Sequence, residues 1–154
     1  MANSHKVLHL LLYIVIGLAG LALGLRLFFG LYQVQGDGME PTLKNQGFYL
    51  VMSRPLTLKK GDIVVFRTNT GKPLIRRVIG LPNQTVEIKK SKVYVDGKLL
   101  HEPYVTRAEG IGDTEVVNIP ENHYYLLSDD RADTWDSRRM GTIHQNQLLG
   151  KFIH

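Results

Sequence analysis

The sequence predicts a mostly β, antiparallel domain that follows one N-terminal transmembrane helix. Two observations support this fold class. One long uncharged apolar run lies near the N-terminus, and the rest of the chain alternates short β-branched and aromatic runs with turn residues. A length of 154 residues, with 44% hydrophobic and 21% charged residues, suits a single folded domain.

The first predicted element is a transmembrane helix over residues 10–32, after a short cytoplasmic flank of residues 1–9. No charged residue lies between Leu10 and Leu25, and the apolar run resumes after Arg26. As a helix this segment would be ~35 Å long, against a hydrocarbon core of ~30 Å. Arg26 can extend to the headgroups and Tyr32 can lie at the interface. We therefore expect a single-pass protein of the cell membrane, with its N-terminus in the cytoplasm and its β domain outside.

A cleaved secretory signal is the alternative interpretation of this run. Lys6 precedes it, and Gly20-Leu21-Ala22 resembles a small-x-small cleavage site. The apolar run continues well beyond Ala22, which favours an uncleaved anchor. Gly20 and Gly24 form a GxxxG pair, but glycine is common in membrane helices, so helix dimerisation stays open.

Residues 33–154 are predicted to form one antiparallel, mostly β domain. Gly61-Asp62, Asn69-Thr70-Gly71 and Asp96-Gly97 are turn signals, and Asp-Gly is typical of a tight hairpin. Helical periodicity is absent between them. The predicted strands are residues 48–51, 63–66, 74–81, 85–88, 93–95, 99–100, 116–117, 123–127 and 148–153.

Charge and composition exclude several classes of function. The net charge of +5 is too small to indicate nucleic-acid binding. The absence of cysteine excludes disulfides, thiolate metal sites and cysteine nucleophiles, and the six histidines are scattered without metal-like or triad-like spacing. We therefore expect no metal and no cofactor. The basic run Lys89-Lys90-Ser91-Lys92 is interpreted as a solvated strand edge.

Three segments resemble the conserved boxes of bacterial type I signal peptidases. Residues 34–43, VQGDGMEPTL, resemble the nucleophile box, in which Gly38 takes the place of the family's serine. Residues 74–82, LIRRVIGLP, look like the strand of the general-base lysine, whose place is taken by Arg76. Residues 128–141, SDDRADTWDSRRMG, are similar to the box that supports the lysine. The resemblance runs from Arg26 to the end of the chain and has the spacing of the compact Gram-positive form.

The resemblance implies a coiled antiparallel β domain at the outer membrane face. It also implies supporting roles for Thr134, which matches a serine that contacts the lysine, and for the pair Asp136 and Arg138. Four apolar residues match positions in the substrate groove, although each is equally well explained as core: Met39, Leu43, Leu74 and Ile75.

The chemistry of a serine/lysine peptidase is missing at both matched positions. Gly38 has no nucleophile, and Arg76 cannot act as a base because guanidinium stays protonated. Arg76 is expected to form a salt-bridge cluster with Asp37, Asp129 and Asp130. Gly38→Ser with Arg76→Lys is the smallest expected rescue of activity.

These features predict a non-catalytic member of the family. Its expected role is to bind an extended or signal-peptide segment of exported proteins, as a chaperone or assembly factor. Two alternatives stay open: an active signal peptidase with a rearranged nucleophile such as Asp37 or Ser137, and a structural membrane-anchored domain without clients.

Overall fold

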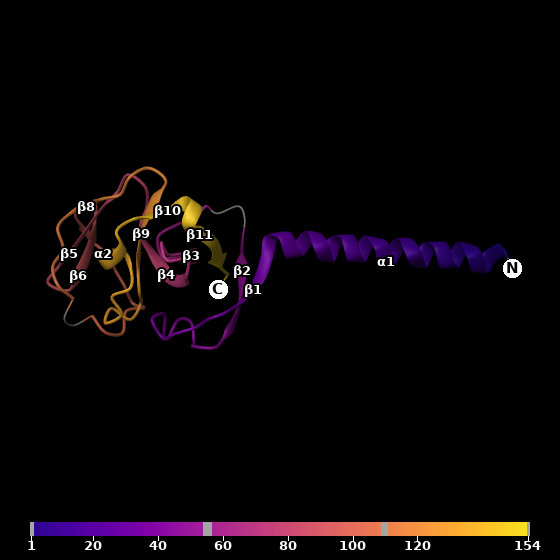
Figure 1. The fold of residues 1–154 in the computed structure, drawn as a ribbon, viewed down its shortest axis with the longest axis horizontal. Helices are drawn as coiled ribbons and strands as arrows, with labels where there is room; N and C mark the ends of the chain where they lie inside the picture. The colour runs from indigo at the N-terminus through magenta and orange to yellow at the C-terminus, as the bar shows by residue number, and fades with distance from the viewer. Residues whose placement is uncertain (1, 54–56, 109–110, 154) are drawn as a thin grey trace.

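A long helix leads away from a two-sheet β domain (Figure 1). The computed structural model describes residues 2–53, 57–108 and 111–153, so the first residue of the predicted flank and the last of the predicted β domain lie outside the described residues. The helix, α1, runs from Ala2 to Phe28, and its N-terminal end is remote from the sheets. In the part of the chain that is described, no helix combines the length and the apolarity needed to cross a membrane.

The β domain contains two antiparallel sheets, as the sequence predicts. The larger has the order β1-β2-β11-β3-β4-β9-β10, and the smaller has the order β7-β6-β5-β8. The elements after α1 are β1 (Phe29–Gln33), β2 (Phe48–Met52), β3 (Ile63–Arg67), β4 (Pro73–Gly80), β5 (Thr85–Lys89), β6 (Lys92–Val95), β7 (Lys98–Leu99), β8 (Val117–Asn118), β9 (His123–Leu127), α2 (Ser137–Met140), β10 (Ile143–His144), the short 3-10 helix η1 (Gln145–Gln147) and β11 (Leu148–Phe152).

The prediction that the helix continues to Tyr32 is wrong. The helix ends at Phe28, and the next five residues form β1, which pairs with β2 from Phe29 opposite Met52 to Gln33 opposite Phe48. This pairing satisfies the backbone of the segment, and Gly30 disfavours a helical continuation. The ring of Tyr32 packs edge-on against Phe152, with the ring centroids 6.0 Å apart. Tyr32 is therefore part of the sheet and not of the helix.

The predicted Asp-Gly hairpin is confirmed. Asp96 and Gly97 both have positive φ angles, 51° and 72°, and they connect β6 to β7. Positive φ at both central residues is the geometry of the type I′ turn that joins tightly paired strands. The hairpin forms one edge of the smaller sheet.

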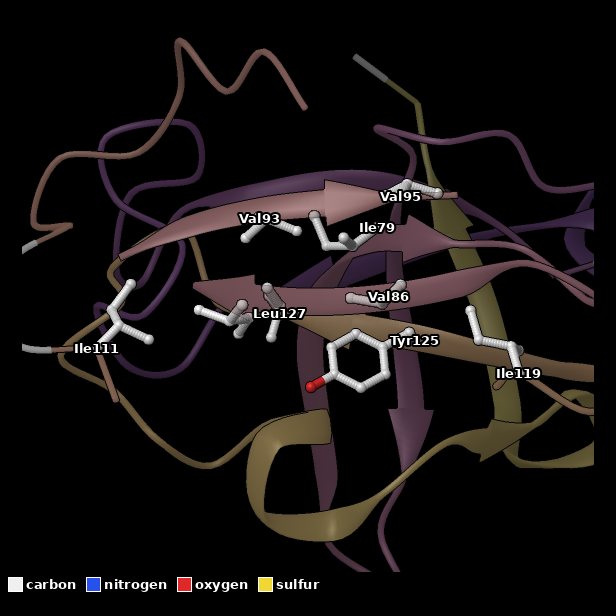
Figure 2. Close-up of a cluster of buried hydrophobic side chains, with 9 residues drawn as sticks. Ile79, Val86, Val93, Val95, Ile111, Ile119, Tyr125 and Leu127 are labelled. Atoms are coloured by element: carbon white, nitrogen blue, oxygen red, sulfur yellow. The ribbon is translucent and has the colours of Figure 1, made fainter. Parts of the chain in front are cut away.

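Three clusters of buried apolar side chains form the core. Figure 2 shows one of them, in which β4, β5, β6 and β9 contribute Ile79, Val86, Val93, Tyr125 and Leu127. A second cluster fixes the segment between β1 and β2 against β4, and it includes Val34, Met39, Leu43 and Ile75. The third lies on the opposite face of β4, where Leu74 packs against it. The segment that carries Gly38 is therefore held in place by buried residues on both sides of it.

Candidate active site

Gly38 is buried at the point where the β1–β2 segment meets the loop after β9. We call residues 128–136, between β9 and α2, the β9–α2 loop. The carbonyl oxygen of Gly38 accepts hydrogen bonds from Ser128 Oγ at 2.6 Å and from the backbone N–H of Asp130 at 3.0 Å. These bonds connect residues 34–43, which resemble the nucleophile box, to residues 128–141, which resemble the supporting box.

The structure also brings Gly38 and Arg76 together. A Cβ atom placed on Gly38 would lie 3.3 Å from Arg76 Nη1, 3.1 Å from Ser128 Oγ and 2.6 Å from Asp133 Oδ2. The first two distances are close contacts, whereas the third is shorter than a Cβ atom tolerates. The space beside Gly38 is thus occupied by the carboxylate of Asp133.

Arg76 is 5% exposed and is held by three acceptors. Its guanidinium donates to Asp133 Oδ2 at 2.6 Å, to the carbonyl oxygen of Ile75 at 2.6 Å and to that of Trp135 at 3.0 Å. Burial lowers the pKa of Arg76 from its usual value, and the adjacent Asp133 carboxylate opposes this shift. An arginine so paired remains a cation and cannot accept a proton.

The predicted salt-bridge cluster is present, but its partners differ from those expected. Arg76 pairs with Asp133, which the sequence analysis did not name. Asp129 pairs with Arg77, Asp130 pairs with Arg107, and Asp37 is exposed. The expectation that Asp37, Asp129 and Asp130 surround Arg76 is therefore wrong, because the turns of the loop direct each carboxylate to a different arginine.

The Arg77–Asp129 pair is the most deeply buried of these contacts. Arg77 donates from Nε to Asp129 Oδ1 at 2.7 Å and from Nη2 to Asp129 Oδ2 at 2.5 Å, and the side chain of Asp129 is fully buried. Thr42 donates to the same carboxylate at 2.8 Å. The guanidinium carbon of Arg77 lies 3.9 Å from the ring centre of Tyr104. Burial raises the pKa of Tyr104, so its hydroxyl stays protonated.

Asp136 and Arg138 form the ion pair that the resemblance implies, at 2.6 Å. Asp136 caps α2 by accepting from the backbone N–H of Arg138 at 3.0 Å, and it also accepts from the N–H of Ser128 at 3.1 Å. Thr134 is exposed, and among the described residues its hydroxyl has no hydrogen-bond partner. The backbone carbonyl of Trp135 contacts Arg76 instead.

Three of the four groove candidates are part of the core. Met39 is 2% exposed, Leu43 1% and Ile75 6%, whereas Leu74 is half-buried. Met39, Leu74 and Ile75 also border a small pocket of about 50 Å³, and Leu43 does not. This pocket is lined by Tyr32, Val34, Gln35, Gly36, Gly38, Met39, Pro73, Leu74, Ile75 and Arg76.

Within the described ranges, one edge of β4 has no strand paired with it next to this pocket. Residues 73–76 pair with β3, while β9 begins its pairing only at Arg77. Along β4, alternate residues direct their N–H and C=O groups toward β3. The bonds from Val78 N to Asp62 O and from Thr68 N to Lys72 O show which residues do so, and they place the N–H and C=O of Ile75 on the side away from β3. An extended peptide could therefore add to the sheet here, although Arg76 Nη1 already occupies the carbonyl of Ile75.

Comparison with known proteins gives one consistent match. Residues 7–154 match the family model described as signal peptidase, peptidase S26. Signal peptidase I of Bacillus amyloliquefaciens is 35% identical, over 91% of this chain and 81% of its own length. Signal peptidase IB of Staphylococcus aureus strain COL is 34% identical, over 78% and 73% respectively. The crystal structure of a signal peptidase I from Enterococcus faecalis aligns with a TM-score of 0.57 and 27% identity, and it covers 66% of this chain and 100% of that one.

Proposed function

Because the chain belongs to the signal peptidase family, peptidase S26, we propose that it binds extended segments of exported proteins without cleaving them. The observation that carries this proposal is the pairing of Gly38, which has no side chain, with the buried cation Arg76. A serine/lysine mechanism needs a hydroxyl nucleophile beside an amine that can be neutral. We infer that Gly38 and Arg76 occupy the positions of that dyad.

The hydroxyls of the two nearby serines are held in structural contacts. Ser128 Oγ donates to the Gly38 carbonyl, and Ser137 Oγ accepts from the backbone N–H of Leu126 at 2.9 Å. The side chain of Asp37 is exposed to solvent, whereas the next residue, Gly38, is buried at the candidate site. No lysine takes part in the hydrogen bonds around Gly38 and Arg76 among the described residues. These contacts favour a binding role over a rearranged active site.

The free edge of β4 supports peptide binding. An added strand gains main-chain hydrogen bonds and inserts alternate side chains into pockets, and it needs no nucleophile. The small pocket beside Gly38 and Ile75 would accept a small side chain. We propose Met39, Leu74 and Ile75 as its walls and assign Leu43 a packing role.

The purified chain in detergent should bind, but not cleave, a signal-peptide substrate. A fluorescein-labelled peptide of about twelve residues containing Ala-Gln-Ala should show saturable binding in fluorescence polarisation. The same peptide with an N-methylated backbone should bind at least about tenfold more weakly, because methylation removes strand hydrogen bonds. A labelled pre-protein should stay intact in the same conditions.

The names of the relatives favour a second candidate, an active signal peptidase. Cleavage of the pre-protein that disappears on replacement of Asp37 or Ser137 by alanine would establish that function and overturn our proposal. Absence of both binding and cleavage would leave a structural role for the domain.

No described helix reaches the length and apolarity of a membrane crossing, but we also propose, from the exposed apolar surface of α1, that α1 is a single-pass anchor in the cytoplasmic membrane, with the β domain outside. The large apolar side chains described between Leu10 and Leu23 are at least 50% exposed. Apolar surface of this extent is unfavourable in water and favourable in lipid. Its uncharged sequence continues to Leu25, and Arg26 follows.

Protease added to intact protoplasts should digest the β domain and leave a protected fragment that contains α1. Cytoplasmic marker proteins are the control for membrane integrity. They should resist the protease in intact protoplasts and be digested when the cells are lysed first. A mature N-terminus after Ala22, or a β domain that resists protease until lysis, would rule out this topology.

A further inference from the structure

A second and larger pocket, of about 760 Å³, lies beside the first. The β3–β4 turn, β4, the β9–α2 loop, α2 and η1 contribute to its walls. Trp135, which is 52% exposed, is the largest side chain among them. The lining residues are Thr68, Asn69, Thr70, Lys72, Leu74, Trp135, Arg139, Met140, Thr142, Ile143 and Gln147.

The two pockets meet at β4. Leu74 borders both of them, and the carbonyl of Trp135 accepts from Arg76, whose Nη1 lies next to Gly38. Leu74 and Ile75 are neighbours in a strand, so their side chains point to opposite faces of the sheet. A peptide paired with residues 73–76 would likewise direct alternate side chains to the two faces. One set would approach the small pocket, and the neighbouring set would approach the larger one.

The larger pocket is positively charged. Among the residues that the structure describes, Lys72 and Arg139 are its only charged lining residues, both are exposed, and no carboxylate borders it. Arg76, Arg77, Arg131 and Arg138 nearby are all neutralised by carboxylates, whereas neither Lys72 nor Arg139 takes part in an ion pair within the described residues. The guanidinium carbon of Arg139 lies 4.0 Å from the ring centre of Trp135, which holds this cation at the pocket wall.

We propose that this pocket selects an acidic side chain on the bound peptide. The inference rests on the proposed function and specifies the class of client: an extended segment with a small side chain at the Gly38 pocket and Asp or Glu an odd number of residues away. The carboxylate would meet Lys72 and Arg139, while Leu74 and Trp135 would cover its methylene groups.

The test uses pairs of fluorescein-labelled peptides of about twelve residues that contain Ala-Gln-Ala. Each pair differs only by Glu or Gln at one position, and that position is moved along the peptide. At the preferred position the Glu peptide should bind about 3- to 10-fold more tightly to the full-length chain, and the preference should shrink at high salt. Lys72→Gln with Arg139→Gln should abolish the preference, so that the Glu and Gln peptides bind this variant with the same Kd. Lys92→Gln with Lys98→Gln, which removes two exposed cations from the smaller sheet, should preserve it.

The outcomes separate this inference from the proposed function. Equal binding of Glu and Gln peptides at every position would overturn the inference and leave peptide binding intact. A Glu preference that survives Lys72→Gln with Arg139→Gln would show that the acidic side chain binds elsewhere. Phosphatidylglycerol vesicles test whether lipid is instead the ligand of the two cations. Vesicles that compete with peptide binding to the parent chain but not to this double variant, together with no preference for Glu, would assign the cations to lipid and overturn the inference. Failure of every peptide to bind would overturn both proposals.

Discussion

Gly38→Ser, Arg76→Lys and Asp133→Ala together should produce a chain that cleaves a pre-protein, at a rate at least about 100-fold above that of the serine–lysine double variant. The single variant Gly38→Ser should stay inactive, because a serine beside a guanidinium has no proton acceptor. The first two changes introduce the nucleophile and the base that the family uses. The third is required by the structure.

Asp133 obstructs a restored dyad in two ways. Its Oδ2 atom lies 2.6 Å from the position that a Cβ atom on residue 38 would take. Its carboxylate would also pair with a lysine at position 76 and keep that amine protonated, which prevents it from acting as a base. With Asp133 removed, burial lowers the pKa of such a lysine and favours its neutral form. The serine–lysine double variant, the smallest rescue expected from the sequence, should therefore be poorly active.

Single-turnover cleavage of a labelled pre-protein in detergent measures this rescue. The matched control carries Gly38→Ala in place of Gly38→Ser, with the other two substitutions retained, and should be inactive. Efficient cleavage by Gly38→Ser alone would mean that another base serves the site and that the role inferred for Arg76 is wrong.

Asp129→Ala should reduce the free energy of unfolding by about 3–5 kcal/mol. The substitution leaves Arg77, which is 5% exposed, as a buried cation without its bidentate partner. It also removes the acceptor of the Thr42 hydroxyl. Urea unfolding followed by tryptophan fluorescence and by circular dichroism measures the loss. Glu87→Gln is the control, because its pair with Lys89 is long, at 3.8 Å, and joins a half-buried carboxylate to an exposed lysine, so it should contribute less than about 1 kcal/mol.

Replacing both members of the buried pair provides a further check. Arg77→Met with Asp129→Leu removes the unpaired charge and should recover part of the loss, since apolar residues of similar volume can replace a buried ion pair. A loss below about 1 kcal/mol for Asp129→Ala would show that water reaches Arg77 and that the pair is not the buried contact described above.

The sequence predicts the strands well because their signals are local. Asp96 and Gly97 are residues that tolerate positive φ, and they identify the β6–β7 hairpin directly. The end of α1 is harder to predict, since an apolar run continues through Phe29 and Leu31. Their conformation is decided by pairing with Met52 and Leu50, which are distant in sequence. The four-residue helix α2 is too short to show a helical period.

The candidate site is predictable in its positions but not in its contacts. The resemblance to the family's boxes identifies Gly38 and Arg76, and the structure brings them together. The partner of Arg76 is Asp133 rather than Asp129 or Asp130, because side-chain direction in the β9–α2 loop depends on the turn at 130–133 and on the cap at Asp136. Lys72 and Arg139 likewise lie together at the larger pocket because of the fold, and their spacing in the sequence does not predict it.

The ion pairs of the β9–α2 loop have a consequence for the order in which the protein folds. Asp133 and Asp129 of this loop bind β4 residues more than 50 positions earlier, Arg131 binds Glu102, and Asp130 binds Arg107. Each contact closes a long stretch of chain, which is slow and becomes favourable only after the strands are in place. We therefore expect the site around Gly38 to be completed late in folding, after the hairpins of both sheets, so that a partly folded chain has strands but no site.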